Sequence, residues 1–188
     1  MSGFELSAPL ETERLLLRAY TAGDFDALFA MRSRPDVARH LYWDAQTEAE
    51  VRTTLEQKTA SAAIRSEGDV LALAVVLEVT DRVIGDVLLK WVSREHRQGE
   101  IGFIFRPDHH GRGYATEAAR PPLRVAFEDL QLHRVVGRLE AWNAASARVL
   151  EKLGMRLEAR LVENEHVKGE WQSELVCAIL DREWLASG

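Results

Sequence analysis

A glycine-rich turn between a strand-like and a helix-like segment places the strongest constraint on the fold of this chain. The run 100–105 predicts a strand, residues 110–116 (HGRGYAT) contain the turn, and residues 117–130 continue with helical spacing. Glycine allows a tight turn and close approach of a ligand to the backbone. The first N–H groups of a helix are unpaired and lie at the positive end of its dipole. Such a turn suits a pyrophosphate, although a Gly-x-Gly turn is also common as a plain connection.

Strand-like and helix-like segments alternate along the whole chain. Apolar runs between turn signals predict strands, and apolar residues recurring every three or four positions predict helices. The predicted strands span 15–20, 70–79, 83–92, 98–106, 134–141, 156–162 and 170–180, and the predicted helices span 21–32, 47–66, 117–130 and 143–153. The order β-α-α-β-β-β-α-β-α-β-β indicates an α/β fold of the α+β mixed-sheet kind, with helices on both faces. Residues 1–188 are expected to form one domain.

Three local features concern helix ends and helix regularity. Thr47 is expected to cap the second helix, and Gly154 is expected to end the last one. Pro121 and Pro122 fall inside the helix that follows the glycine turn. Because an interior proline removes a backbone hydrogen bond and costs roughly 3 kcal/mol, we predict a kinked helix whose first turn is intact.

Composition and charge narrow the classes of function. The chain is 46% hydrophobic and 29% charged, no apolar run is long enough to span a membrane, and the first residues lack signal-peptide features. A cytoplasmic protein is therefore expected. The net charge of −6 disfavours a nucleic-acid partner and suits a cationic one such as an amine. Cys177 is expected to be an inert thiol, and His109 and His110 have no further ligand at a spacing that suits a metal.

Short motifs spread over nearly the whole chain accompany the turn. They are residues 12–18 (TERLLLR), 100–102 (EIG), 111–118 (GRGYATEA), 132–135 (LHRV), Asn143 with Ser146, 150–154 (LEKLG), and 164–165 (NE) before 169–171 (GEW). The turn itself fits the pattern Gln/Arg-x-x-Gly-x-Gly/Ala, with His110 at the first position and Gly113 and Ala115 after it. In this order the motifs resemble the GNAT superfamily of acetyl-CoA-dependent N-acetyltransferases. Within it they resemble the RimJ/RimL-like branch, which acetylates the N-termini of ribosomal proteins.

The resemblance implies a GNAT-like fold with splayed fourth and fifth strands, acetyl-CoA as co-substrate, and no metal. The residues implied to bind acetyl-CoA are Phe103, Ile104, Phe105, His110, Gly111, Arg112, Gly113, Tyr114, Ala115, Thr116, Asn143 and Ser146. The loop would hold the pyrophosphate, the fourth strand would pair with the pantetheine arm, and the N–H of Ile104 or Phe105 would face the thioester oxygen. Core packing for residues 103–105 and an N-cap for Asn143 are the structural alternatives.

Three residues are candidates for proton transfer. The resemblance implies that Ser146 gives a proton to the CoA thiolate, because Leu150 stands where many GNAT enzymes have a tyrosine. It implies Glu165 as the general base and Glu100 as the rival base on the fourth strand. The alternatives are a Ser146 hydroxyl bonded to nearby backbone and a solvated loop carboxylate at position 165.

The predicted reaction is acetyl transfer from acetyl-CoA to a primary amine by direct attack in a ternary complex. A protein N-terminus, a small amine, an amino-acid conjugate and an aminoglycoside all stay open as acceptors. His40, Tyr42 and Trp43 are expected to line the acceptor entrance, with helix packing as the alternative. A non-catalytic acyl-CoA-binding or sensing module, and a transferase that uses a longer acyl-CoA, are the competing functions. Neither nucleic acid nor a membrane is expected as a partner, and a homodimer through the final strands stays open.

Overall fold

An eight-stranded mixed sheet forms the centre of the computed structural model, which describes residues 3–39, 41 and 43–186. The strand order is β2-β3-β5-β6-β7-β8-β10-β9, and every neighbouring pair is antiparallel except β7 with β8. The strands are β2 (Leu10–Glu11), β3 (Leu15–Ala19), β5 (Val70–Leu77), β6 (Arg82–Ser93), β7 (Gln98–Phe105), β8 (Arg134–Glu140), β9 (Arg156–Val167) and β10 (Glu170–Leu180). Two short strands, β1 (Phe4–Glu5) and β4 (Ala63–Ile64), pair separately.

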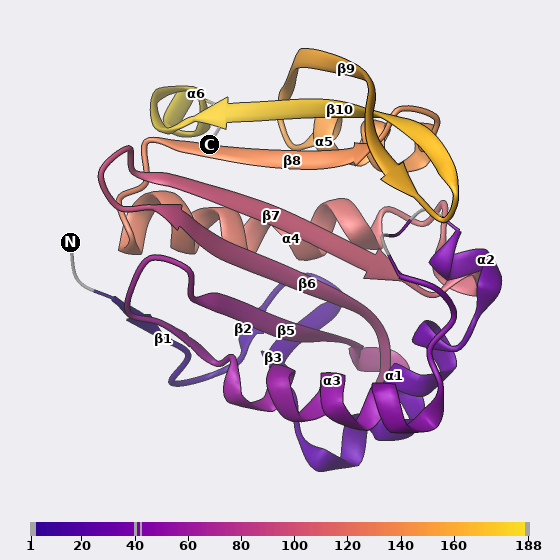
Figure 1. Cartoon of the computed structure of the whole chain (residues 1–188). Helices are drawn as coiled ribbons and strands as arrows, with labels where there is room; N and C mark the ends of the chain where they lie inside the picture. Colours follow the sequence, from indigo (N-terminus) through magenta and orange to yellow (C-terminus); the bar gives the residue numbers. More distant parts are fainter. Residues whose placement is uncertain (1–2, 40, 42, 187–188) are drawn as a thin grey trace.

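Helices cover both faces of this sheet, as Figure 1 shows. The helices are α1 (Phe25–Arg32), α2 (Pro35–Ala38), α3 (Glu48–Ala60), α4 (Tyr114–Arg124), α5 (Ala144–Lys152) and α6 (Asp181–Ala186). The front of Figure 1 carries α1 and α3, and the back carries α4 and α5. The predicted mixed α/β architecture is therefore confirmed. No helix within the described ranges has both the length and the hydrophobicity that a membrane crossing needs.

The core is divided between the two faces of the sheet. On one face, Ile101 and Phe105 of β7 belong to the same buried cluster as Ala118 and Leu123 of α4. On the other, α1 and α3 bury a smaller cluster against β5 and β6. Because side chains alternate along a strand, residues 100, 102 and 104 of β7 face away from α4. The strand thus offers one face to the core and one to the side where the functional site lies.

The sheet opens between β7 and β8, the strands that pair in parallel. β7 and β8 pair at three positions, Gln98 with Arg134, Gly99 with Val135, and Glu100 with Val136. Beyond them, β7 stays paired with β6 and β8 stays paired with β10. The predicted splay is therefore confirmed, and it begins immediately after Glu100.

The helix that contains the two prolines is continuous but irregular. Its first turn is intact, as predicted, because the Glu117 N–H donates to the Gly113 carbonyl at 3.0 Å. α4 passes through Pro121 and Pro122 and continues as a π-helical segment, Val125–Asp129. Since proline has no N–H to bond to the previous turn, the backbone widens after the pair instead of ending there.

Other differences from the sequence expectations have local causes. The helix predicted for 47–66 begins with the expected Thr47 cap but ends at Ala60, because Ala63 and Ile64 form β4 against β1. The strand predicted for 156–162 continues to Val167, since its pairing with β10 runs to the turn at Lys168 and Gly169. Gly154 has the positive φ (84°) expected of a helix end. The short elements α2, α6, β1 and β2 contain too few residues for a periodic pattern.

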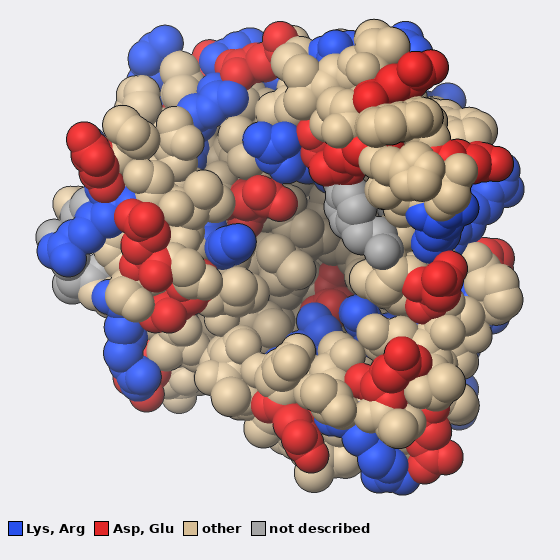
Figure 2. All heavy atoms as spheres, viewed as in Figure 1, with Lys and Arg blue, Asp and Glu red and all other residues tan. Residues whose placement is uncertain are grey.

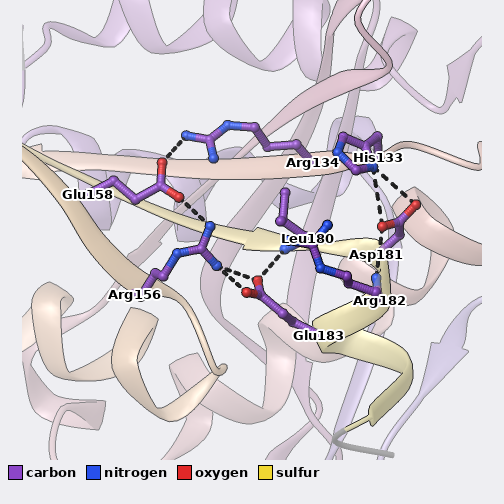
Figure 3. Close-up of polar contacts among 8 residues, drawn as sticks. All are labelled: His133, Arg134, Arg156, Glu158, Leu180, Asp181, Arg182 and Glu183. Atoms are coloured by element: carbon purple, nitrogen blue, oxygen red, sulfur yellow. Dashed lines mark hydrogen bonds and ion pairs between the residues drawn. The ribbon is translucent and has the colours of Figure 1, made fainter.

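An ion-pair network ties the last strands together, as Figure 3 shows. Glu158 of β9 binds both Arg134 of β8 and Arg156, and Arg156 reaches Glu183 of α6. Hydrogen bonding from Arg134 lowers the pKa of Glu158. This network fixes one end of β9 and β10, whose other end borders the functional site.

Candidate active site

Two adjoining cavities lie where β7 and β8 separate. The larger has a volume of about 600 Å³ and the smaller about 110 Å³, and they share Leu41, Phe103, Asn143 and Ser146 as lining residues. Figure 2 shows the face opposite α4 hollowed near its centre, with acidic and basic side chains around the hollow. The splay therefore produces an open site between the two faces of the sheet.

The glycine loop forms one wall of the larger cavity. Gly111 and Gly113 have φ values of 75° and 82°, which favour glycine, and Gly113 is the N-cap residue of α4. The predicted loop residues that line this cavity are His110, Gly111, Gly113, Tyr114, Ala115 and Thr116. Arg112, predicted to bind the ligand with them, does not line the cavity; the residue is exposed, and its carbonyl accepts a hydrogen bond from Arg14. The free N–H groups at the start of α4 thus border a cavity large enough for part of a nucleotide.

His110 ties this loop to the end of β7. Its Nε2 lies 2.9 Å from the carbonyl oxygen of Phe105, so this ring nitrogen carries the hydrogen and donates. His110, at the first position of the loop motif, therefore has a structural role.

Glu117 anchors α4 to the start of the chain. Its carboxylate accepts from the Thr12 hydroxyl at 2.7 Å and from the backbone N–H and guanidinium of Arg14. Arg14 also stacks on Tyr114 and donates to the Arg112 carbonyl. Burial raises the pKa of Glu117, but these hydrogen bonds outweigh it and bring the pKa below its ordinary value of 4.5. Two of the sequence motifs, 12–18 and 111–118, thus form one contact that fixes the loop.

Replacing Glu117 with Gln is expected to lower the free energy of unfolding by about 2 kcal/mol near pH 7, because hydrogen bonds to charged groups contribute about 1.5–3 kcal/mol. Since the folded-state pKa is depressed, the contribution of the carboxylate is complete above pH 4.5 and is lost as the pH falls through the folded-state pKa. Urea unfolding of both proteins at decreasing pH should show their difference shrinking. A difference that is absent near neutrality, or that does not change in acid, would contradict this role.

The register of β7 determines which of its N–H groups face the gap. Arg106 donates its N–H to the Ile84 carbonyl of β6. Because hydrogen-bonded and non-hydrogen-bonded positions alternate along an antiparallel pair, the Ile104 N–H points to β6, and those of Phe103 and Phe105 point into the gap. All three residues line the larger cavity. The sequence predicted that the N–H of Ile104 or of Phe105 would face the thioester oxygen. Of these two, the Phe105 N–H points into the gap, and the Phe103 N–H also does.

Asn143 and Ser146 occupy the start of α5, between the two cavities. The Asn143 side-chain oxygen accepts from the Ser146 N–H at 3.0 Å, so the N-cap role is confirmed. Among the described residues none accepts from or donates to the Ser146 hydroxyl. Leu150 is buried and packs against Gly137 of β8, where an added Cβ would approach the leucine within 2.7 Å. Ser146 thus presents a hydroxyl to both cavities, and Leu150 closes the wall behind it.

The two candidate bases, Glu165 on β9 and Glu100 on β7, do not line the smaller cavity directly. Glu165 lies on β9 directly opposite Gln172 of β10, and Gln172 and Val167 line the cavity. Residues opposite each other in an antiparallel pair share a face, so Glu165 is on the cavity side of the sheet. Glu100 lies at the last paired position before the splay, with its carboxylate 3.8 Å from Nε of Arg138.

Several polar residues at this cavity were not predicted from the sequence. Arg138 and Glu140 line it from β8, and the nearby Glu174 of β10 has only 3% of its surface exposed. The Glu174 carboxylate accepts from Arg138 at 2.9 Å. In the sequence, the one sign of these residues is that charged side chains alternate with apolar ones along the strands. That pattern does not show that Arg138 and Glu174 meet, because their contact depends on the register of the sheet. Among the described residues, no group of three or more His, Cys, Asp or Glu side chains is arranged to hold a metal ion.

The turn between β9 and β10 closes one side of the cavities. Lys168 donates to the carbonyl of Ala38, at the end of α2, at 2.7 Å, and lies 3.7 Å from Asp44. Leu41, between these two contacts in the chain, lines both cavities. The Arg32 guanidinium stacks 4.0 Å from the Trp43 ring, and Trp43 lines neither of the two cavities. His40 and Tyr42 lie outside the described residues.

Comparisons with known proteins agree with this architecture. The family model for the acetyltransferase (GNAT) domain matches residues 14–156. The uncharacterized N-acetyltransferase YnaD of Bacillus subtilis (strain 168) is 30% identical over 175 residues, covering 93% of this chain and 98% of that protein. The spermidine N(1)-acetyltransferase of Escherichia coli (strain K12) is 26% identical over 111 residues, covering 59% and 60%. The putative ribosomal N-acetyltransferase YdaF of Bacillus subtilis (strain 168) is 28% identical over 120 residues, covering 64% and 66%.

Solved structures show the same fold. An acetyltransferase (GNAT family) from Bacillus anthracis superimposes with a TM-score of 0.83 and 28% identity, covering 93% of this chain and 99% of that one. The spermidine N-acetyltransferase from Vibrio cholerae, in complex with CoA and spermine, superimposes with a TM-score of 0.78 and 22% identity, covering 93% and 99%. At 22% identity, the similarity to the Vibrio cholerae structure concerns the fold alone.

Proposed function

This chain belongs to the GNAT family of acetyltransferases and is an N-acetyltransferase, and from this premise we propose that it moves the acetyl group of acetyl-CoA to a primary amine by direct attack in a ternary complex. The observation that carries the proposal is the pair of cavities that meet at Phe103, Asn143 and Ser146. One cavity is bordered by an anion-binding helix start, and the other is bordered by ionisable side chains. A donor and an acceptor can thus meet at one point of the splay.

The larger cavity is the proposed donor site. The N–H groups of the loop at residues 111–116 would hold the pyrophosphate, and His110 keeps the loop against β7. The N–H groups of Phe103 and Phe105 would pair with the pantetheine arm as they would with an added strand. The one of these that lies next to the thioester oxygen would stabilise negative charge developing there.

Two residues are proposed to transfer protons, one near the C-terminal end of β9 and one in the first turn of α5. We propose that Glu165, acting through a water, takes the proton from the acceptor ammonium so that the amine nitrogen can bond to the acetyl carbon. As the carbon–sulfur bond breaks, Ser146 would give its hydroxyl proton to the thiolate and regain a proton, through water, from the nitrogen of the new amide, which must lose its second proton. Glu100 is the rival base, supported by its place at the vertex of the splay.

The proposed acceptor is a small cationic amine. The net charge of −6 favours a cation, and the turn at Lys168 leaves a smaller cavity of about 110 Å³ beside the donor site. The name of the spermidine N(1)-acetyltransferase of Escherichia coli (strain K12), a relative by sequence, supports this class. A protein N-terminus, supported by the RimJ/RimL-like motifs and by the name of YdaF, is the second candidate.

A homodimer through the final strands is also proposed. Leu157, Val162 and Trp171 are apolar residues of β9 and β10 with 58%, 71% and 63% of their surface exposed. β9 is an edge strand, and an exposed apolar edge is a common site of association.

A coupled assay of CoA release tests the enzymatic proposal. With acetyl-CoA, we expect thiol release that depends on added amine, and faster release with spermidine than with a peptide that has a free N-terminus. Longer acyl-CoA donors serve as the comparison for chain length. CoA binding by calorimetry without release for any amine would favour the sensing alternative, and faster release with the peptide would reverse the acceptor assignment.

A further inference from the structure

Two cations on α5 have no assigned partner in the donor site described above. Arg148 and Lys152 both line the larger cavity. They are four residues apart and therefore lie one turn apart on the same side of the helix. Within the described part of the chain, neither side chain has a hydrogen bond or an ion pair. They are therefore available to an anionic ligand in this cavity.

Their place along α5 separates them from the reacting end of the site. Ser146 lines both cavities, whereas Ala145, Arg148, Val149 and Lys152 line only the larger one. At 1.5 Å per residue, Lys152 lies about 9 Å further along the helix axis than Ser146. The two cations thus border the part of the cavity away from the splay. Asp36, which also lines this cavity, is already paired with Arg34.

We infer that Arg148 and Lys152 bind the 3′-phosphate of CoA, an inference that rests on the proposed use of acetyl-CoA. The thiol end must reach Ser146, and the backbone N–H groups of residues 111–116 are the donors for the pyrophosphate. The phosphorylated ribose then lies on the side of the cavity away from the splay, where the two cations are. A phosphate monoester carries about −1.5 to −2 charge at neutral pH, which calls for more than one cation. Arginine offers a paired donor geometry for phosphate, and lysine adds a mobile point charge.

Comparison of CoA with 3′-dephospho-CoA tests this inference. Calorimetry on the wild type should show that loss of the 3′-phosphate weakens binding by about 10-fold or more, as expected for charge-assisted hydrogen bonds. R148A and K152A should each weaken CoA binding while leaving dephospho-CoA binding nearly unchanged. The double variant should bind the two ligands equally, and the preference of the wild type should decline as salt is added.

A matched control separates this effect from a general change of charge. Arg120→Ala removes an exposed cation from α4 that does not line either cavity, and it should preserve the preference for CoA. Arg148→Lys should retain part of the preference, because it keeps the charge without the paired donors.

Three results would overturn the inference and leave the proposed function intact. The wild type could bind both ligands equally, or the double variant could retain the full preference. The double variant could also weaken both ligands by the same factor, which would assign the cations to the pyrophosphate. If the wild type bound neither CoA nor dephospho-CoA, the proposed function itself would fail.

Discussion

Replacement of Glu165 with glutamine is expected to lower kcat/KM for amine acetylation by about 10²- to 10⁴-fold, the usual contribution of a positioned general base. Affinity for CoA should not change, because Glu165 lies on β9 and does not line the larger cavity. Steady-state kinetics with varied amine at saturating acetyl-CoA, together with calorimetry for CoA, would measure both quantities. A loss of turnover with intact donor binding would assign Glu165 to the chemical step.

Two further variants make this experiment decisive. Glu163→Gln removes a charge from the same strand, at an exposed residue with no role in the proposed chemistry, and should leave kcat/KM near the wild-type value. Glu100→Gln tests the rival base at the vertex of the splay. If E100Q loses turnover and E165Q does not, the base is Glu100. If neither variant is impaired, proton transfer by either carboxylate is excluded.

Replacement of Asp86 with alanine is expected to lower the free energy of unfolding by about 3–5 kcal/mol, because it leaves a buried ammonium without its counter-charge. Asp86 accepts from Lys58 Nζ at 2.6 Å, and the two side chains are only 4% and 11% exposed. A change of this size should lower Tm by roughly 6–20 °C in a chain of this length. Thermal and urea unfolding near neutral pH would measure it.

The surroundings of Asp86 are buried, which limits the access of water to the Lys58 ammonium when the carboxylate is removed. Its second oxygen, Oδ1, and the Tyr20 hydroxyl are both buried, and neither has a hydrogen-bond partner among the described residues. Burial raises the pKa of Tyr20 well above its ordinary value, and the Asp86 carboxylate raises it further. Burial does not depend on Asp86, so it keeps the phenol neutral in the variant, and the phenol cannot replace the lost carboxylate.

Matched variants distinguish this effect from ordinary loss of an ion pair. Removing both charges with Asp86→Ala and Lys58→Met should recover much of the stability, since a buried pair can be replaced by apolar groups at little cost. Glu48→Ala breaks the Arg52 pair, whose side chains are 62% and 60% exposed, and should cost at most about 1 kcal/mol. A loss of similar size for D86A and E48A would contradict the proposed burial effect.

Local sequence signals predicted the parts of this protein that depend on neighbouring residues. The glycines of the loop and the caps at Thr47 and Asn143 follow from backbone geometry within a few positions. The alternation of side chains along β7 predicted which of its residues face the core. Helix 47–66 was predicted too long because the pairing of β4 with β1, far away in the sequence, overrides local helical propensity.

The parts that depend on register could not be predicted in this way. Arg138 and Glu174 belong to different strands and meet only because β8 and β10 pair in one particular alignment. The same holds for Asp86 and Lys58, which come from a strand and a helix. No spacing within the sequence encodes such contacts, so the loop could be predicted, whereas the acceptor side of the site could not.

The turn at Lys168 belongs to the last part of the site to be synthesised. During synthesis, the glycine loop and α5 leave the ribosome before the strands that carry Val167 and Gln172. The residues of the donor cavity are therefore synthesised before those of the wall beside the acceptor, but a domain generally folds as a unit, so the site is complete only after the final strands emerge. Catalytic competence is in this sense a late event of biogenesis, acquired only when the final hairpin has docked on α2.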